Sequence, residues 1–296
     1  MEVVIAGAGS IGLLIGSYLA ESGWKVTFFV RRAEQAKLIQ SQGIQRINQP
    51  DSAVVFEVKA ETDIQRVSKD VPWIVAVKSA GVASIVDTLI AQQIKNPILF
   101  VQNGFSHFNL VSSTALPNVF FSTVEHGAGR IDDRTVSHNG IGVMKIAPYR
   151  GVASSFDALK SSSTTSFPIE FVADARKTVF RKVLINCMIN PLTAILQLKN
   201  GELLVNSYAK TLFDQLYDEV LNAFPEMHCE LPKSAVEEIC RRTCDNESSM
   251  LNDRLKGRPM EIDTIVSVLL QMAEERGKRM PLLKTLEQLL YAVDRS

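Results

Sequence analysis

A row of polar side chains at four-residue intervals is the feature of this sequence most suited to chemistry. Lys182, Asn186 and Asn190 lie in the segment FRKVLINCMINPLTA, which begins at Phe180. Steps of four residues place all three side chains on one face of a helix, beside an apolar face. Pro191 restricts the backbone of the residue before it, so we expect the helix to end or kink at Asn190.

A second polar cluster lies nearer the end of the sequence. Asn246 and Ser249 belong to the segment NESSML, and Glu261 belongs to the segment MEID. Hydride addition to a carbonyl carbon leaves negative charge on the oxygen, which an ammonium such as that of Lys182 can neutralise. Amide and hydroxyl donors suit the carboxylate and hydroxyl groups of a small acid. Carbonyl reduction is therefore a chemistry that these residues could support.

A glycine-rich segment at the start of the sequence could hold a cofactor for that reaction. Its G-x-G-x-x-G spacing directly follows the apolar run Val3–Ala6 and opens a helical pattern over Ile11–Ala20. In such turns the first glycine permits the turn, the second admits a pyrophosphate and the third allows close packing of helix on strand. The pattern predicts dinucleotide binding rather than a plain tight turn. The residues concerned are Gly7, Ala8, Gly9, Ser10, Ile11 and Gly12.

Polar side chains also follow other predicted strands. NAD-binding proteins usually place an acidic residue after the second strand, whereas Arg31 and Arg32 stand there in this sequence. A guanidinium favours a 2′-phosphate, so we expect a preference for NADPH, the alternative being a solvated loop. Lys78 and Asn103 close two later strands at the same edge, where ligands bind, although Asn103 also suits an ordinary Asn-Gly turn.

The pattern of elements predicts an α/β fold with two domains. Short β-branched runs alternate with helical patterns to about residue 170, and helical patterns alone follow Ala173. We expect a Rossmann-type doubly wound sheet over residues 1–172 and an all-helical domain over residues 173–296. The predicted strands are Val3–Ala6, Lys25–Val30, Ala53–Val58, Trp73–Val77, Pro97–Val101, Val119–Val124, Val136–Ile146 (strand or hairpin) and Ile169–Val172.

An apolar stripe in the second domain predicts a further long helix. Its members recur at helical spacing from Ile262 to Ala273, with Pro259 expected in the first turn and Gly277 at the end. A stripe of this kind could also form a homodimer contact, although the sequence does not define an oligomeric state.

Composition narrows the class of partner. The 296 residues contain 32 basic and 32 acidic side chains, a balance that does not favour a nucleic-acid binder. We see no apolar run of the length needed to cross a bilayer and no leader segment, so we expect a cytoplasmic protein without a membrane contact. The four cysteines lack histidine pairs at ligand spacing, so we expect reduced thiols and no metal. A small molecule is the expected partner.

The motifs taken together resemble the ketopantoate reductase (2-dehydropantoate 2-reductase) family. In chain order they are GAGSIG, Arg31, Lys78, QNG, RKVLINCMINPLTA, NGEL, NESSML and MEID, and they cover nearly the whole chain. The resemblance implies a Rossmann domain followed by a helical domain, with the active site in the cleft between them. It also implies NADPH-dependent reduction of 2-dehydropantoate, a small 2-oxo acid, to (R)-pantoate on the route to pantothenate and coenzyme A.

The resemblance implies particular roles for the residues of these motifs. Lys182 would be the proton donor, and Glu261 would lie close to both the reacting centre and the cofactor. Asn103 would face both nicotinamide and substrate, and Ala128 would contact the cofactor. The implied substrate-binding residues are Asn103, Asn186, Asn190, Asn200, Asn246 and Ser249.

Two other functions remain open at this point. One is the reduction of a different small 2-oxo acid, because pocket shape depends on residues outside these motifs. The other is a sensor that binds NADPH without doing chemistry. Such a sensor would have little reason to retain Lys182, the asparagine row, Ser249 and Glu261 together.

Overall fold

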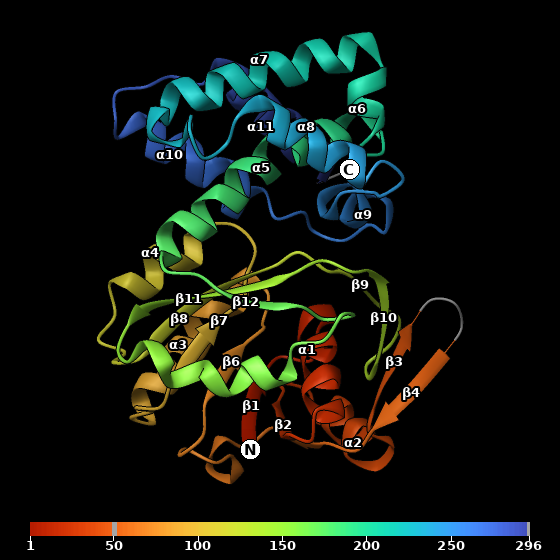
Figure 1. The fold of residues 1–296 in the computed structure, drawn as a ribbon, viewed down its shortest axis with the longest axis vertical. Helices are drawn as coiled ribbons and strands as arrows, with labels where there is room; N and C mark the ends of the chain where they lie inside the picture. Colours follow the sequence, from red (N-terminus) through yellow and green to blue (C-terminus); the bar gives the residue numbers. More distant parts are fainter. Residues whose placement is uncertain (49–51, 295–296) are drawn as a thin grey trace. The chain divides into compact units, whose positions relative to one another are not determined.

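The structure is a computed structural model that describes residues 1–48 and 52–294, and it consists of two compact units (Figure 1). The first unit contains Met1–Gln102 and His107–Val179. The second contains Asn103–Ser106 and the chain from Phe180 onward. The division expected near Ala173 lies just before helix α5, whereas the two units divide within that helix.

The first unit is built on an eight-stranded sheet in the order β12-β11-β8-β7-β6-β1-β2-β5. The strands from β8 to β5 in this order are parallel, and β11 is antiparallel to β8. The chain visits β2 and β5 on one side of β1 and returns to β6 on the other, so the topological switch point lies between β1 and β6. This arrangement confirms the expected doubly wound sheet. The strands are β1 (Glu2–Ala6), β2 (Lys25–Phe29), β5 (Lys59–Glu61), β6 (Trp73–Val75), β7 (Ile98–Phe100), β8 (Val119–Val124), β11 (Met144–Arg150) and β12 (Ile169–Phe171).

A second, four-stranded sheet was not expected from the sequence. It has the order β4-β3-β10-β9 and comprises β3 (Ile44–Asn48), β4 (Ser52–Phe56), β9 (Gly127–Arg130) and β10 (Thr135–Gly140). The predicted strand Ala53–Val58 therefore belongs to this sheet as β4. The predicted segment Val136–Ile146 divides into β10 and β11, which lie in different sheets.

Helix α1 (Ser10–Glu21) packs against both sheets of the first unit (Figure 1). It contacts β1 and β2 of the large sheet and β3, β9 and β10 of the small one. Every residue from Gly12 to Leu19 is buried, as expected for a helix that is covered on all sides. The other helices of this part of the chain are α2 (Ala33–Gln42), α3 (Val82–Ala91), α4 (Ser106–Ser112), and the short 3₁₀ helices Ile64–Arg66, Ser79–Gly81 and Ala153–Ser162.

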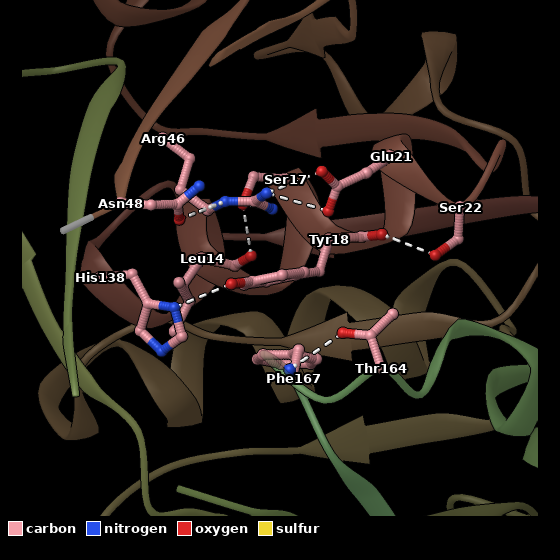
Figure 2. Close-up of polar contacts among 10 residues, drawn as sticks. All are labelled: Leu14, Ser17, Tyr18, Glu21, Ser22, Arg46, Asn48, His138, Thr164 and Phe167. Carbon is pink, nitrogen blue, oxygen red and sulfur yellow. Dashed lines mark hydrogen bonds and ion pairs between the residues drawn. The ribbon is translucent and has the colours of Figure 1, made fainter. Parts of the chain in front are cut away.

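A buried arginine on β3 explains why that strand was missed (Figure 2). The Arg46 side chain is 3% exposed, and its Nη2 donates to both carboxylate oxygens of Glu21 at 2.8 and 2.9 Å. Its Nη1 donates to Ser17 Oγ at 3.3 Å and its Nε to Asn48 Oδ1 at 3.0 Å. The guanidinium carbon lies 3.7 Å from the centroid of the Tyr18 ring. The charged side chain occupies a buried position of the strand, so the apolar alternation typical of a strand is interrupted there. The Glu21 side chain is 44% exposed, so solvent shares in stabilising this pair.

Three hydrogen-bonded rings continue from this ion pair, and Figure 2 shows the first two of them, Tyr18 and His138. Tyr18 Oη lies 2.8 Å from His138 Nδ1, and His138 Nε2 lies 3.1 Å from His126 Nδ1. Phe167 stacks on both Tyr18 and His126, with ring centroids 4.5 and 4.4 Å apart. Burial lowers the pKa of His138, and the nearby Arg46 lowers it further, so the neutral ring is favoured in the fold.

Acidification is therefore expected to destabilise the first unit through His138. Below the ordinary histidine pKa of about 6.5, the unfolded chain binds more protons at this residue than the folded protein does. The stability that the neutral His138 contributes above that pH is therefore lost as the pH falls through the lowered pKa of the folded state. Melting temperatures at about pH 7.5 and about pH 5.5 test this, with His138→Gln as the comparison. On acidification the melting temperature of the wild-type protein should fall more than that of the variant. Identical falls would contradict the role of His138 in the pH dependence.

The second unit is helical apart from its loops. Its longest helix, α5, runs from Ala175 to Leu196 with Pro191 inside it, so of the two expected outcomes, an end or a kink at Asn190, the end is wrong. Pro191 leaves the Cys187 carbonyl without its usual donor, but buried residues on most sides of α5 maintain the helix through this position. The remaining helices are α6 (Glu202–Val205), α7 (Ser207–Ala223), the 3₁₀ helix Pro225–Met227, α8 (Lys233–Arg242), α9 (Ser249–Leu255), the π-helix η5 (Asp263–Ser267), α10 (Val268–Glu274) and α11 (Pro281–Asp294).

Two expectations about apolar helices need correction. α5 is long and apolar enough to cross a bilayer by length and composition, but 72% of its most apolar window is buried inside the chain, as in the core helix of a globular protein. The stripe from Ile262 to Ala273 lies mostly in the core of the chain, so these residues are not available for the dimer contact expected of them. That helix begins at Ile262, and Pro259 precedes it instead of occupying its first turn.

Candidate active site

The glycine turn between β1 and α1 has the geometry of a phosphate-binding turn. Gly7 has φ +103°, and a Cβ there would lie 2.9 Å from the Val77 nitrogen. A Cβ on Gly12 would lie 2.0 Å from the Gly7 carbonyl oxygen, so these two glycines are required by packing. A Cβ on Gly9 would meet nothing within 4 Å, so no described residue requires a glycine at this position. Close approach of a ligand gives a reason for it.

The N-terminus of α1 is prepared for an anion. Gly9 is the N-cap and offers no side-chain hydrogen bond to the first turn, which also contains no acidic residue. The first N–H groups of the helix therefore have no capping side-chain acceptor among the residues that the structure describes, and the helix dipole favours negative charge at this end.

Positive side chains follow the strands on both sides of β1. Ala6 pairs with Phe29 of β2 and with Val75 of β6, so the carboxyl ends of three parallel strands lie side by side. Arg31 follows β2 and Lys78 follows β6, and both side chains are exposed. The structure thus places both residues at the edge predicted from the sequence, next to the switch point.

Gln102 is a buried residue of this edge that the sequence did not single out. Its Nε2 donates to the carbonyl oxygens of Val75 at 2.7 Å and Val77 at 3.1 Å, which ties the end of β7 to the end of β6. These two acceptors fix the orientation of the amide, because a reversed amide would place its oxygen against two carbonyls. Asn103 follows directly, so the Gln102 contacts restrain the start of the next segment.

Asn103 is brought close to the Glu261 segment within the second unit. The Phe105 N–H donates to the Thr264 carbonyl at 2.9 Å. Gly104 has φ +81°, and a Cβ there would lie 2.4 Å from the same carbonyl oxygen, so only glycine fits. Thr264 Oγ1 in turn lies 3.3 Å from the Glu261 carbonyl. The structure therefore unites two segments that are far apart in the sequence.

The helix after Glu261 opens with a π-helical turn that the sequence did not indicate. Glu261 is half-buried and stands just before the helix, whose π-helical residues are Asp263–Ser267. Such turns are rare and often occur at functional sites. Thr264, which contacts the Asn103 segment, lies within this turn.

The polar row on α5 has the positions expected from its spacing. Lys182 and Asn186 are half-buried, whereas Asn190 is 4% exposed. Asn190 Nδ2 donates to Ser249 Oγ at 3.3 Å. Two polar clusters that were recognised separately in the sequence therefore meet through this hydrogen bond.

A neighbouring loop holds Asn200 beside Asn246. The Asn200 N–H donates to the Asn246 carbonyl at 3.0 Å, and Asn200 Nδ2 donates to Thr243 Oγ1 at 2.9 Å. Gly201 donates to the Cys244 carbonyl at 3.2 Å, and a Cβ on this glycine would lie 2.5 Å from the Cys244 Cβ. The Asn200 Oδ1 atom is buried without a hydrogen-bond partner among residues 1–48 and 52–294.

Ser248 is a further residue that sequence reasoning missed. It is the N-cap of α9, accepts a hydrogen bond from the Leu251 N–H at 3.1 Å, and lies 2.7 Å from Thr193 Oγ1. Ser248 thereby holds the start of α9, including Ser249, against α5. Its role as an N-cap could have been predicted, because it is a serine directly before an apolar helical segment.

Other expected features lie outside these clusters. Ala128 is in β9, pairs with His138 and packs against the core of the first unit, whose α1 also contacts β9. The four cysteines are free thiols, and burial raises the pKa of Cys240 to about 11. No group of three metal-ligating side chains occurs among the described residues.

The glycine turn in a parallel sheet, followed by a helical unit with a lysine, amides and a carboxylate, defines a protein of the Rossmann-plus-helical class. The family model described as Ketopantoate reductase PanE/ApbA matches residues 3–151, and the model of its C-terminal part matches residues 174–294. The chain belongs to the ketopantoate reductase family.

Individual relatives are similar to this chain over nearly its full length. The chain is 36% identical to a 2-dehydropantoate 2-reductase from Listeria innocua, covering 99% of this chain and 97% of that one. A crystal structure of a probable 2-dehydropantoate 2-reductase from Bacillus subtilis matches with a TM-score of 0.88 and 32% identity, over 99% of this chain and 100% of the other. A D-mandelate dehydrogenase in complex with NADH and anilino(oxo)acetate shares the fold, with a TM-score of 0.84 and 22% identity over 100% of this chain and 99% of the other.

Proposed function

We propose that the protein reduces the ketone of 2-dehydropantoate to (R)-pantoate with NADPH. The observation that carries this proposal is full-length similarity to 2-dehydropantoate 2-reductases, the L. innocua relative at 36% identity among them. The glycine turn and the polar clusters of the helical unit support it, because they supply the groups that such a reduction requires.

The cofactor would be bound mainly by residues of the first unit. The α1 N-terminus would receive the pyrophosphate, with the backbone of Gly7, Ala8, Gly9, Ser10, Ile11 and Gly12 around it. Arg31 and Lys78 would add positive charge on either side, Ala128 would contact the cofactor, and Asn103 and Glu261 would lie near its nicotinamide. When bound, the nicotinamide supplies a hydride to the carbonyl carbon.

Lys182 would supply the proton in this scheme. A lysine ammonium suits a developing alkoxide because it carries a positive charge and three N–H donors. Its half-buried position excludes part of the surrounding water, which strengthens a hydrogen bond to a charged oxygen. Glu261 would orient the ammonium and balance its charge. No other proton donor is required by the proposal.

The neutral polar groups would bind the rest of the substrate. The Asn190–Ser249 hydrogen bond joins two of these groups, and Asn186 is half-buried one turn earlier on the same helix. Asn200 and Asn246 are joined through the backbone of the neighbouring loop. Amide and hydroxyl donors can bind a carboxylate and a hydroxyl without an additional charge.

Replacing Arg31 with alanine should reduce the preference for NADPH. Because the variant loses a charge-assisted contact with the 2′-phosphate, we expect its KM for NADPH to rise about tenfold. The KM for NADH should change little. Steady-state kinetics with both cofactors measure this, and Lys25→Ala removes an exposed charge from the opposite, amino edge of the sheet as a control. Equal efficiency of wild-type protein with both cofactors would contradict the role of Arg31.

The substrate itself requires a direct comparison. The D-mandelate dehydrogenase shares the fold at 22% identity, so the fold alone does not select the 2-oxo acid. An NADPH-oxidation assay with 2-dehydropantoate and several other small 2-oxo acids distinguishes the candidates. Highest kcat/KM with 2-dehydropantoate supports the proposal. Preference for another acid would favour a related reductase, and NADPH binding without any turnover would favour a sensor.

A further inference from the structure

The end of β9 brings a third arginine close to the segment that follows β2. Arg130 of β9 and Arg32, the residue before α2, both form ion pairs with the same oxygen, Oδ1, of Asp133. Arg31 directly precedes Arg32 and is exposed. Two guanidiniums from different segments therefore meet at one carboxylate, and Arg31 is the sequence neighbour of one of them, at the strand end where Rossmann proteins distinguish NAD from NADP.

The turn between β9 and β10 is fixed to the glycine turn by a buried side chain. Gln35 is 7% exposed, and its Nε2 donates to the Ala8 carbonyl at 3.0 Å and to the Asp133 carbonyl at 2.8 Å. The turn is also rigid internally, since Asp132 Oδ1 accepts from the backbone N–H groups of residues 134 and 135 at 2.8 and 2.7 Å. Arg130 Nε adds a bond to the Asp132 carbonyl at 2.9 Å. The position of Arg130 is thus linked to that of the phosphate-binding turn.

The arginines of this group have hydrogen-bond donors left for a further anion. Asp132, Asp133 and the exposed Glu34 in the first turn of α2 balance the three arginines in charge, so the capacity lies in unused N–H donors. Each guanidinium has five N–H donors, and the contacts of Arg32 and Arg130 with Asp133 use one terminal nitrogen of each. Arg130 Nε also donates to the Asp132 carbonyl, but the side chains of Arg32 and Arg130 are 46% and 37% exposed, so terminal N–H donors of both are accessible to a ligand.

We infer that Arg130 is a specificity-determining residue that binds the 2′-phosphate of NADPH together with Arg31 and Arg32. Asp133 aligns the two guanidiniums that it pairs, which reduces the side-chain entropy lost on binding. NADH presents a neutral hydroxyl at this position and gains little from the cluster. The inference rests on the proposed function and adds a residue outside the strand-end motif to its cofactor site.

A purely structural role for Arg130 is the competing explanation. In that case the Arg130–Asp133 pair would only stabilise the β9–β10 turn, and its loss would affect all nucleotide ligands alike. Adenosine 2′,5′-bisphosphate and 5′-AMP separate the two explanations, because they differ only by the phosphate in question.

The test is calorimetric titration of the full-length protein with these two nucleotides. Arg130→Gln should weaken binding of the bisphosphate about tenfold, equivalent to about 1.4 kcal/mol, and leave 5′-AMP binding unchanged. Arg32→Gln should act in the same direction, and Arg130→Lys should restore part of the affinity. Lys25→Gln, which removes a charge paired with Glu2 at the amino edge, is the matched control and should change neither affinity.

The outcomes separate this inference from the proposed function. If Arg130→Gln weakens the binding of both nucleotides equally, or weakens neither, the inference about Arg130 is overturned. The proposed NADPH specificity would still stand if the wild-type protein preferred the bisphosphate. Wild-type protein that binds both nucleotides equally would overturn the NADPH preference itself and this inference with it. Melting temperatures show whether each variant is folded. If the Arg130→Gln protein is not folded, the nucleotide affinities of Arg32→Gln decide between the two explanations.

Discussion

Replacing Lys182 with alanine is expected to lower turnover by about a hundredfold or more while NADPH binding is largely retained. The expectation follows from the position of Lys182 in the half-buried polar row of α5 and from its proposed role as proton donor. Without the ammonium, the developing alkoxide would take its proton from water. The loss should therefore appear in kcat, with a smaller effect on the dissociation constant of NADPH.

A matched lysine on the same helix controls for the change in charge. Lys177 lies in the first turns of α5 and is exposed, so Lys177→Ala should leave kcat near the wild-type value. Single-turnover measurements show whether the chemical step is the one affected. Near-normal turnover of the Lys182→Ala protein would exclude the lysine as the proton donor.

Gly9→Asp is expected to weaken cofactor binding strongly while preserving the fold. Gly9 has an ordinary φ of −84° and open space around a Cβ, and aspartate is a favoured N-cap with a charge that suits the helix dipole. The same carboxylate would occupy the place proposed for the pyrophosphate and repel it. We expect affinity for NADPH to fall by about a hundredfold or more, with an unchanged or slightly higher melting temperature.

Two companion variants separate the causes of this effect. Gly9→Asn retains the cap and most of the volume without the charge, so it should weaken NADPH binding less than aspartate does. Gly12→Ala should instead lower the melting temperature, because its Cβ would clash with the Gly7 carbonyl at 2.0 Å. Tight NADPH binding by the Gly9→Asp protein would contradict the assignment of this turn as the cofactor site.

The parts of the fold predicted correctly are those specified by local chemistry. The glycine turn appears where a strand, a tight turn and a helix follow one another, and each step is encoded within twelve residues. The parallel strands β1, β6 and β7 are buried on both faces, so their apolar runs were visible in the sequence. The polar row on α5 also followed directly from helical periodicity.

The parts that were missed depend on contacts that are distant in sequence. β3 has Arg46 at a buried position, and this becomes acceptable only because Glu21 and Tyr18 on α1 compensate the charge. The continuation of α5 through Pro191 depends on surrounding packing rather than on local preference. Neither compensation can be recognised before the partner elements have been placed.

In the candidate site, too, the residues found from the sequence belong to local patterns, and the residues missed depend on distant contacts. Lys182 and Glu261 were chosen by residue type, pattern and family resemblance, and their catalytic roles remain predictions. Gln102, Ser248 and Thr264 were missed because each acts through hydrogen bonds to the backbone or to a distant side chain. The π-helical turn at Asp263–Ser267 had no signal at all in the spacing of its apolar residues.

Product analysis with purified protein, NADPH and 2-dehydropantoate tests the central claim most directly. We expect (R)-pantoate to be formed in equal amount to the NADPH consumed, and Lys182→Ala to lower both rates by the same factor. Formation of no pantoate by a folded protein that binds NADPH would contradict it.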